Sequence, residues 1–300
     1  MGMDQALTLP SRGSGIDRVP PHLWFVGSAV FHYLGPSFAV LLFAHLGVLG
    51  VAWLRIASAA LVFAVWRRPW RILRDADRGT VVVMALLGAC LAGMNSLFYL
   101  AIDRLPLGLV AAIEFVGTIG VALVGLRSPR NYLALALAAG GVLLLTSLRW
   151  ASDAWGLAFA VANGVLFVVY IMLGHRLARR GAGSNIDRLG LAMLMALVFV
   201  MPIGLDEALP AFSAPLLLLA GIGVGVSSSV IPYVCDQLAM RNLPRNSYAL
   251  MLAILPATAT AIGALVLAQI PSLRDLCGIG LVMLGVALHQ QQESGGEAGA

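Results

Sequence analysis

Ten apolar runs, each about 20 residues long, follow one another along the chain with only short linkers between them. They lie at 21–42, 47–66, 79–101, 107–126, 131–148, 154–174, 189–205, 215–239, 247–268 and 273–289. About 20 apolar residues is the length that an α-helix needs to cross the roughly 30 Å hydrocarbon core of a bilayer. The sequence therefore predicts an all-α integral membrane protein with ten transmembrane helices.

The composition favours the same fold class. Of the 300 residues, 60% are hydrophobic and only 11% are charged, and the mean hydropathy is +0.92. A typical soluble domain has about 25% charged residues. The linkers leave no room for a soluble domain, and the polar segments at residues 1–20 and 290–300 are expected to be disordered cytoplasmic tails.

Positive charge is distributed unevenly among the linkers. All 19 basic residues are Arg. If the N-terminus is cytoplasmic, most of them fall in cytoplasmic segments, three fall in outer linkers, and Arg55 lies within the second run. Cytoplasmic loops of membrane proteins carry such an excess of Arg. The distribution predicts that both termini are cytoplasmic, and it assigns the charge to membrane topology with no nucleic acid as a partner.

A short motif occurs twice in the sequence. The segment YLAIDRLP at Tyr99–Pro106 resembles QLAMRNLP at Gln237–Pro244, and the same shift places the first five runs over the last five. Because five is odd, the second copy enters the membrane from the opposite side, as in inverted-repeat secondary transporters. We expect two inverted-topology five-helix repeats at 21–148 and 154–289. The alternative is a chance match between two Leu- and Ala-rich helices.

Three longer segments resemble a known family. They are GMNSLFYLAIDRLPLGLVAAIEFVGTIGVAL at 93–123, VAWLRIASAALV at 51–62 and ANGVLFVVYIMLGHR at 162–176. They are similar to the third and fourth, the second and the sixth helices of EamA-type transporters of the drug/metabolite transporter superfamily, most closely the threonine and homoserine exporters. The resemblance implies ten helices in two inverted repeats that export small metabolites across the bacterial inner membrane.

The chain also departs from the family's pattern. Leu255 stands before Pro256 where such exporters often carry Glu-Pro, and Gln269 replaces an acidic residue at the end of the same helix. Thr118 stands where a Pro is common. These departures leave open the substrate and any coupling that uses a carboxylate of the second half.

Two charged residues lie inside predicted helices. Glu114 is about eight residues from Pro106 at the outer end of its run, and Arg55 is equally far from Gly47. At about 1.5 Å per residue, both lie roughly 12 Å deep, where they could meet. Charges at this depth mark substrate or proton pathways. We expect Arg55 to bind a substrate carboxylate and Glu114 an amino group or a coupling proton. The alternative is a structural ion pair.

Further polar residues fall at intermediate depths in other runs. The weaker substrate-binding candidates are Asn95, Tyr99, Asn163, Tyr170 and Ser228. Ser and Asn in membrane helices also bond to a neighbouring helix or to their own backbone. Tyr also occurs in the aromatic belts at the membrane interface. Each of these residues therefore has a structural alternative.

Two prolines within the runs are candidate helix breaks. Pro36 and Pro256 would free backbone carbonyls at the depth of a cavity. Asp236, near the inner end of its run, is expected instead to be a solvated or paired charge at the interface, with a cytoplasmic gate as the alternative.

Catalytic and ATP-binding motifs are missing from the sequence. It contains no HExxH, GxSxG or GxxxxGK[ST] motif. Cys90, Cys235 and Cys277 lie in apolar runs without metal-ligand spacing. We expect a secondary transporter that works by alternating access, with no enzymatic activity, no cofactor and no metal. Its partners would be a small molecule and the lipid bilayer, and a homodimer stays open. The alternative function is a passive facilitator or channel.

Overall fold

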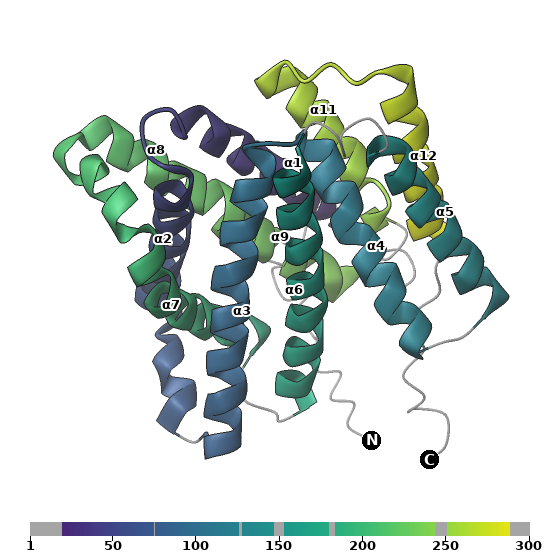
Figure 1. Cartoon of the computed structure of the whole chain (residues 1–300). Helices are drawn as coiled ribbons and strands as arrows, with labels where there is room; N and C mark the ends of the chain where they lie inside the picture. Colours follow the sequence, from purple (N-terminus) through teal and green to yellow (C-terminus); the bar gives the residue numbers. More distant parts are fainter. Residues whose placement is uncertain are drawn as a thin grey trace, which may run out of the picture.

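The computed structural model describes residues 20–74, 76–125, 128–146, 153–179, 184–243 and 251–288. Every regular element within these ranges is a helix (Figure 1). The two predicted tails lie outside the described residues, apart from Pro20. The prediction of an all-helical chain is confirmed for the part that the structure describes.

The helices of the first half are long and follow one another with short connections. They are α1 (Pro21–Leu42), α2 (Val48–Arg67), the short 3₁₀ helix η2 (Pro69–Arg74), α3 (Arg78–Ile102), α4 (Leu107–Gly125) and α5 (Pro129–Thr146). The second half contains α6 (Ala154–Arg179), α7 (Asn185–Ser213), α8 (Pro215–Gly225), the π-helical turn η3 (Val226–Val230), α9 (Ile231–Asn242), α11 (Leu255–Leu267) and α12 (Leu273–Leu288).

Each of the ten predicted apolar runs overlaps a described helical segment, although the run at 247–268 does so mainly over α11 (Leu255–Leu267) and lies partly outside the described residues. The run at 215–239 is a single apolar stretch in which α8, η3 and α9 are continuous. Among the described residues, seven such segments are long and apolar enough to cross a membrane, while the described apolar part of α4 and the whole of α11 are shorter. The chain is therefore a multi-pass membrane protein. Ten spans in inverted order stay a prediction.

Helices α2 and α7 form a closely packed antiparallel pair. Their backbones approach at Gly50 and Gly204 so closely that an added Cβ would overlap the other helix. At one end, the Glu207 carboxylate accepts hydrogen bonds from the first N–H groups of α2, at Leu49 (2.9 Å) and Gly50 (3.0 Å). A carboxylate there stabilises the unpaired N–H groups and the positive end of the helix dipole.

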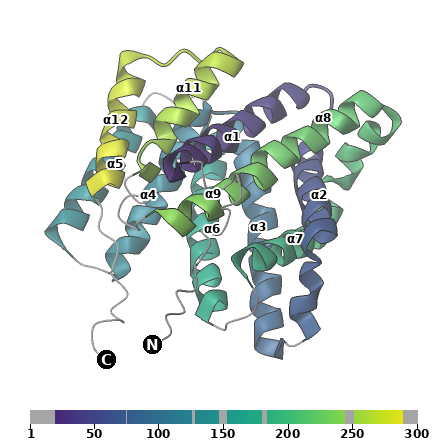
Figure 2. The ribbon, with the colours of Figure 1, turned by 180° about the vertical axis from the view of Figure 1, so that it is seen from behind.

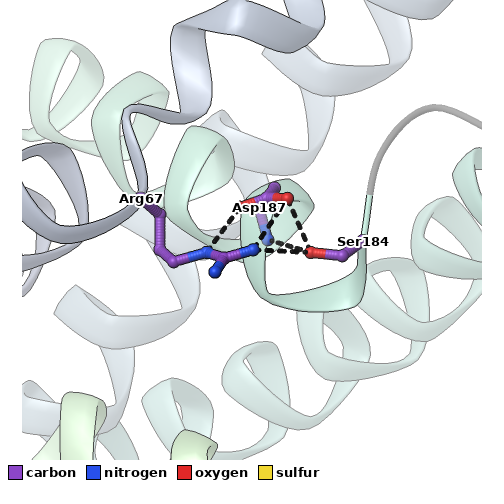
Figure 3. A network of polar contacts seen from close by, with 3 residues as sticks. All are labelled: Arg67, Ser184 and Asp187. Carbon is purple, nitrogen blue, oxygen red and sulfur yellow. Dashed lines mark hydrogen bonds and ion pairs between the residues drawn. The ribbon is translucent and has the colours of Figure 1, made fainter.

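The other end of the α2–α7 pair carries an ion pair (Figure 3). The Nε of Arg67 donates to the Asp187 carboxylate at 2.8 Å, and Ser184 donates to the same carboxylate at 2.7 Å. Ser184 also caps α7, since its side chain accepts from the Asp187 N–H. Polar groups therefore fix both ends of a long apolar contact.

Helices α5 and α12 form a second close pair. Gly141 and Gly285 each face the backbone of the other helix, and the Nε of Arg130 donates to the Leu288 carbonyl at 2.7 Å. Small residues allow such close approach between apolar helices. Figures 1 and 2 show the α2–α7 and α5–α12 pairs at opposite sides of the molecule, with α1, α6 and α9 between them.

The packing between the halves follows a repeated pattern. Helix α1 packs on the α8–η3–α9 segment and on α11, and α6 packs on α3 and α4. Helix α2 contacts α8, and α7 contacts α3. If each helix is replaced by its counterpart five predicted spans away, each of these contacts becomes another contact of the same set. For example, the contact of α1 with α11 becomes that of α6 with α4.

Substitutions at two adjacent glycines of α5 test the close α5–α12 contact. A Cβ at Gly141 would lie 2.5 Å from the Gly278 carbonyl oxygen, whereas a Cβ at Gly140 would meet nothing within 4 Å. We expect Gly141→Ala to destabilise the protein by about 1–3 kcal/mol through overpacking. Gly140→Ala should leave stability unchanged or raise it, because Ala favours the helix. Thermal unfolding in detergent measures both, and equal melting temperatures would contradict the packing.

Candidate substrate site

The centre of the site is the π-helical turn η3, which interrupts the helix between α8 and α9. Single π-turns inside helices occur frequently at functional sites. Pro232, just after the turn, has no N–H to bond to the Ser228 carbonyl as an α-helix would require. The side chains of Ser227 and Ser228 both donate to the Val224 carbonyl instead of to another helix. The sequence therefore frees a carbonyl in the middle of an apolar segment.

Arg55 of α2 uses this carbonyl. Its side chain is almost completely buried, with 5% of the residue exposed. The Nη2 donates to the Ser228 carbonyl at 3.3 Å, and the Nε donates to the Ser229 hydroxyl at 3.1 Å. The guanidinium carbon also lies 5.3 Å from the centre of the Tyr99 ring, a cation–π distance. Arg55 thus joins α2 and α3 of the first half to η3 of the second.

Two glycines allow the helices to meet at this point. A Cβ at Gly225 would overlap the backbone of α2 at Arg55 and the Ser58 side chain. A Cβ at Gly35 of α1 would overlap Ser228. The π-turn is therefore held between α1 and α2 at backbone contact distance, and Arg55 reaches it without crossing an open gap.

Glu114 of α4 is half-buried near the same centre. Its carboxylate interacts electrostatically with Arg55, Tyr33 and Tyr233. No hydrogen bond or ion pair joins Glu114 to any residue that the structure describes, and the ion pairs within this part of the chain are Arg67–Asp187 and Arg104–Asp153. Arg55 and Glu114 are therefore neighbours without direct contact.

Two buried polar side chains near this centre lack hydrogen-bond partners among the described residues. Asn163 of α6 is 0% exposed, and neither its Nδ2 nor its Oδ1 has a partner. The next residue, Gly164, packs against the backbone of α4 at Glu114. The Tyr99 hydroxyl is also buried without a partner; it lies beside Arg55 and Ser228, but neither approach has hydrogen-bond geometry. Unpaired buried polar groups cost about 1–3 kcal/mol each unless a ligand or water satisfies them.

The remaining predicted residues take different positions. Asn95 is buried on α3, where its Nδ2 donates to the Leu91 carbonyl of its own helix at 2.7 Å. Pro36 lies inside α1, which continues through it, and Pro256 is the second residue of α11, directly after a turn. The side chain of Thr118 lies outside the described residues.

Gln269, one of the departures from the family pattern, has a structural partner. Helix α11 ends at Ala268, which has a left-handed backbone with φ +54°. The following Gln269 lies against the start of α4, and its Oε1 accepts from the Leu107 N–H at 3.1 Å. The amide oxygen thus caps α4 as a carboxylate would, without its charge.

A cavity of about 300 Å³ opens between α3, α6, α7 and α9. Its polar lining consists of Tyr170, Arg188, Tyr233, Asp236 and Gln237. We call it the Tyr170–Tyr233 cavity. The sequence predicts Tyr170 as a substrate-binding residue and Asp236 as a charge at the membrane interface, and both line this cavity.

Sequence reasoning missed Tyr33 and Tyr233. Tyr33 is fully buried on α1, and Tyr233 interacts electrostatically with both Arg55 and Glu114. The available signal was the position of Tyr233 directly after Pro232, at the break in the helix. A tyrosine in an apolar run does not otherwise differ from one that packs in the core.

The lack of a hydrogen-bond partner for the Asn163 amide leads to a testable prediction. If substrate supplies its partners, Asn163→Leu should raise the melting temperature of the substrate-free protein, since it removes an unsatisfied group of about 1–3 kcal/mol. Transport of substrate should fall at the same time. Asn95→Leu is the matched control, because Asn95 already has a partner, and it should not raise the melting temperature. A lower melting temperature for Asn163→Leu would mean that the amide is satisfied in the empty protein.

Comparisons with known proteins identify relatives of this chain. The EamA-like transporter family matches residues 154–289. The threonine/homoserine exporter RhtA of Salmonella typhimurium (strain LT2) is 32% identical over 265 residues, which cover 86% of this chain and 88% of the exporter. The protein of the same name from Escherichia coli (strain K12) is 31% identical over 266 residues, covering 87% of this chain and 88% of the exporter.

A solved crystal structure of another protein shares the fold. It aligns with a TM-score of 0.56 over 89% of this chain and 97% of that chain, at 18% sequence identity. At this identity the likeness concerns the fold alone. The similarity to the exporters over most of the chain and the match of the second half together show that the chain belongs to the EamA-like transporter family.

Proposed function

We propose that the protein exports amino acids of the threonine and homoserine type, or related small metabolites with both charges, across the bacterial inner membrane. It does so as a ten-helix secondary transporter with both termini in the cytoplasm. The two halves at 21–148 and 154–289 are inverted repeats, and the substrate binds between them. The names of the relatives support the substrate class. The observation that carries the proposal is that Arg55 and Glu114, which bear opposite charges, interact electrostatically without forming an ion pair with each other.

The packing of the helices supports the inverted repeats. When α1 to α5 are exchanged for their counterparts five spans later, the main contacts between helices are preserved. In the α2–α7 pair and in the α5–α12 pair, the two helices are each other's counterparts, so the exchange leaves both pairs unchanged. An odd number of spans in each half then places the second half in the opposite orientation.

Arg55 is suited to hold a substrate carboxylate. A guanidinium has five N–H donors in a planar fork, and Ser228 and Ser229 occupy only two of them. The remaining donors can bind a carboxylate bidentately. Because the side chain is buried, this attraction is less screened than in water.

Glu114 is suited to hold the other end of the substrate. Its carboxylate has no hydrogen-bond partner among the described residues, yet its charge interacts with that of Arg55. A zwitterionic amino acid placed between them would pair its ammonium with Glu114 and its carboxylate with Arg55. With no substrate bound, a proton on Glu114 would remove the unpaired charge, which supports proton coupling.

The helix break supports alternating access. Arg55 crosses from α2 to η3 of the second half, so movement of the α8–η3–α9 segment against α2 changes its contacts. The α2–α7 and α5–α12 pairs, with glycine contacts along their lengths, are the rigid parts about which the centre moves. The π-turn and Pro232 leave the segment between them free to bend.

Efflux measurements test the proposal. Cells that express the protein are preloaded with labelled threonine or homoserine, and efflux is followed for the wild type, Glu114→Gln and Arg55→Gln, with and without a protonophore. We expect both variants to lose at least about tenfold in rate, the effect of about 1.4 kcal/mol. Asp206→Asn, which neutralises an exposed carboxylate on α7, is the control and should retain full efflux.

The protonophore separates the two transport modes. Efflux that it abolishes in the wild type means a proton-coupled exporter. Saturable efflux that survives it means a passive facilitator. Full efflux in both Glu114→Gln and Arg55→Gln would contradict the site and would leave the two residues with a structural role only.

A further inference from the structure

The Tyr170–Tyr233 cavity has the size and the lining of a site for a small metabolite. Its volume is about 300 Å³, at the lower end of the range for small-molecule pockets. Leu87, Ile171, Leu177 and Leu189 form its apolar wall. A few polar groups on an apolar wall are the usual composition of such pockets.

Opposite charges line this cavity from two helices. Asp236 comes from α9, and Arg188 comes from the first turns of α7. Tyr170 and Tyr233 line the same cavity as the carboxylate, and both tyrosines interact with it electrostatically. A carboxylate next to tyrosine rings attracts an ammonium group, and a guanidinium binds a carboxylate. The cavity therefore matches a zwitterion, the same class of molecule that Arg55 and Glu114 match.

Tyr233 belongs to both places. It lines the cavity, and it interacts with Asp236 on the cavity side and with Arg55 and Glu114 at the central site. Tyr233 is thus close enough to both pairs of charges to interact with each of them electrostatically.

The cavity lies at the end of the molecule where Arg67 pairs with Asp187, since Arg188 is the next residue of α7. The distribution of Arg along the sequence assigns this end to the cytoplasm. Substrate for export would arrive there first.

We propose that the Tyr170–Tyr233 cavity is a second binding site, which holds a zwitterionic α-amino acid on its way from the cytoplasm to Arg55 and Glu114. Asp236 binds the ammonium, and Arg188 binds the carboxylate. The inference rests on the proposed export function for its substrate class, but the two charges that carry it, Asp236 and Arg188, are not part of the central site.

A cysteine at the cavity wall tests this second site. The three native cysteines are replaced by Ala, Gln237→Cys is introduced, and the purified full-length protein is labelled with N-ethylmaleimide in the presence and absence of L-threonine or L-homoserine. We expect saturating amino acid to slow labelling at least about fivefold, about 1 kcal/mol of protection. Ser213→Cys, at the exposed far end of α7, is the control and should label at one rate throughout.

Amino acid bound in the cavity could slow labelling directly, and amino acid bound at the central site could slow it through a conformational change. Variants of each site distinguish these two causes. Protection should persist when Glu114→Gln is added and should disappear when Asp236→Asn is added. Butylamine and butyrate, which each carry one of the two charges, should protect less than the amino acids. Protection that is lost in Glu114→Gln, or that survives in Asp236→Asn, would overturn the second site.

Measuring both efflux and labelling on the same protein distinguishes failure of this inference from failure of the proposed function. Efflux without protection at residue 237 would leave the exporter and remove the second site. Protection without efflux would leave the cavity as an amino-acid site and remove export. No protection by either amino acid in the otherwise unchanged protein would also overturn the second site.

Discussion

A buried guanidinium is the constraint on which the centre of this structure depends. A charge inside an apolar helix bundle must be given polar partners. Arg55 finds them in the Ser228 carbonyl and the Ser229 hydroxyl. That carbonyl is available because Pro232 has no N–H to donate to it. A proline in the second half thus leaves free the backbone carbonyl that binds a buried charge of the first half.

The rest of the bundle is arranged around this contact. Glycines let α1 and α2 approach the π-turn, and the flanking α2–α7 and α5–α12 pairs are closed by glycine contacts and by polar groups near the helix ends. A protein interior that is close-packed transmits small shifts instead of absorbing them. Rigid flanks and an interrupted centre are therefore the mechanical basis of the proposed alternating access.

Two of the buried unsatisfied side chains lie near the central site, and a third, Trp53 with its Nε1, lies where α2 packs on α7. Asn163 and Tyr99 are buried without partners within the described ranges, and Glu114 lies near them without a hydrogen bond or ion pair. Stable cores pair such groups, so their presence favours a ligand at this place. Gln269 differs: its departure from the family pattern keeps the capping oxygen and loses only the charge.

The sequence by itself determined the helical class, the positions of the helical segments and the two intramembrane charges, because apolar length and isolated charges are local properties. It also singled out Asn163 and Tyr99. It could not decide whether Arg55 and Glu114 pair. Nor could it show that Tyr33 and Tyr233 lie within electrostatic reach of Glu114, or that Asp236 lines a cavity with Tyr170. Those relations depend on how helices distant in the sequence pack, on a π-turn that shifts the side chains after it, and on glycine contacts that only the tertiary structure decided.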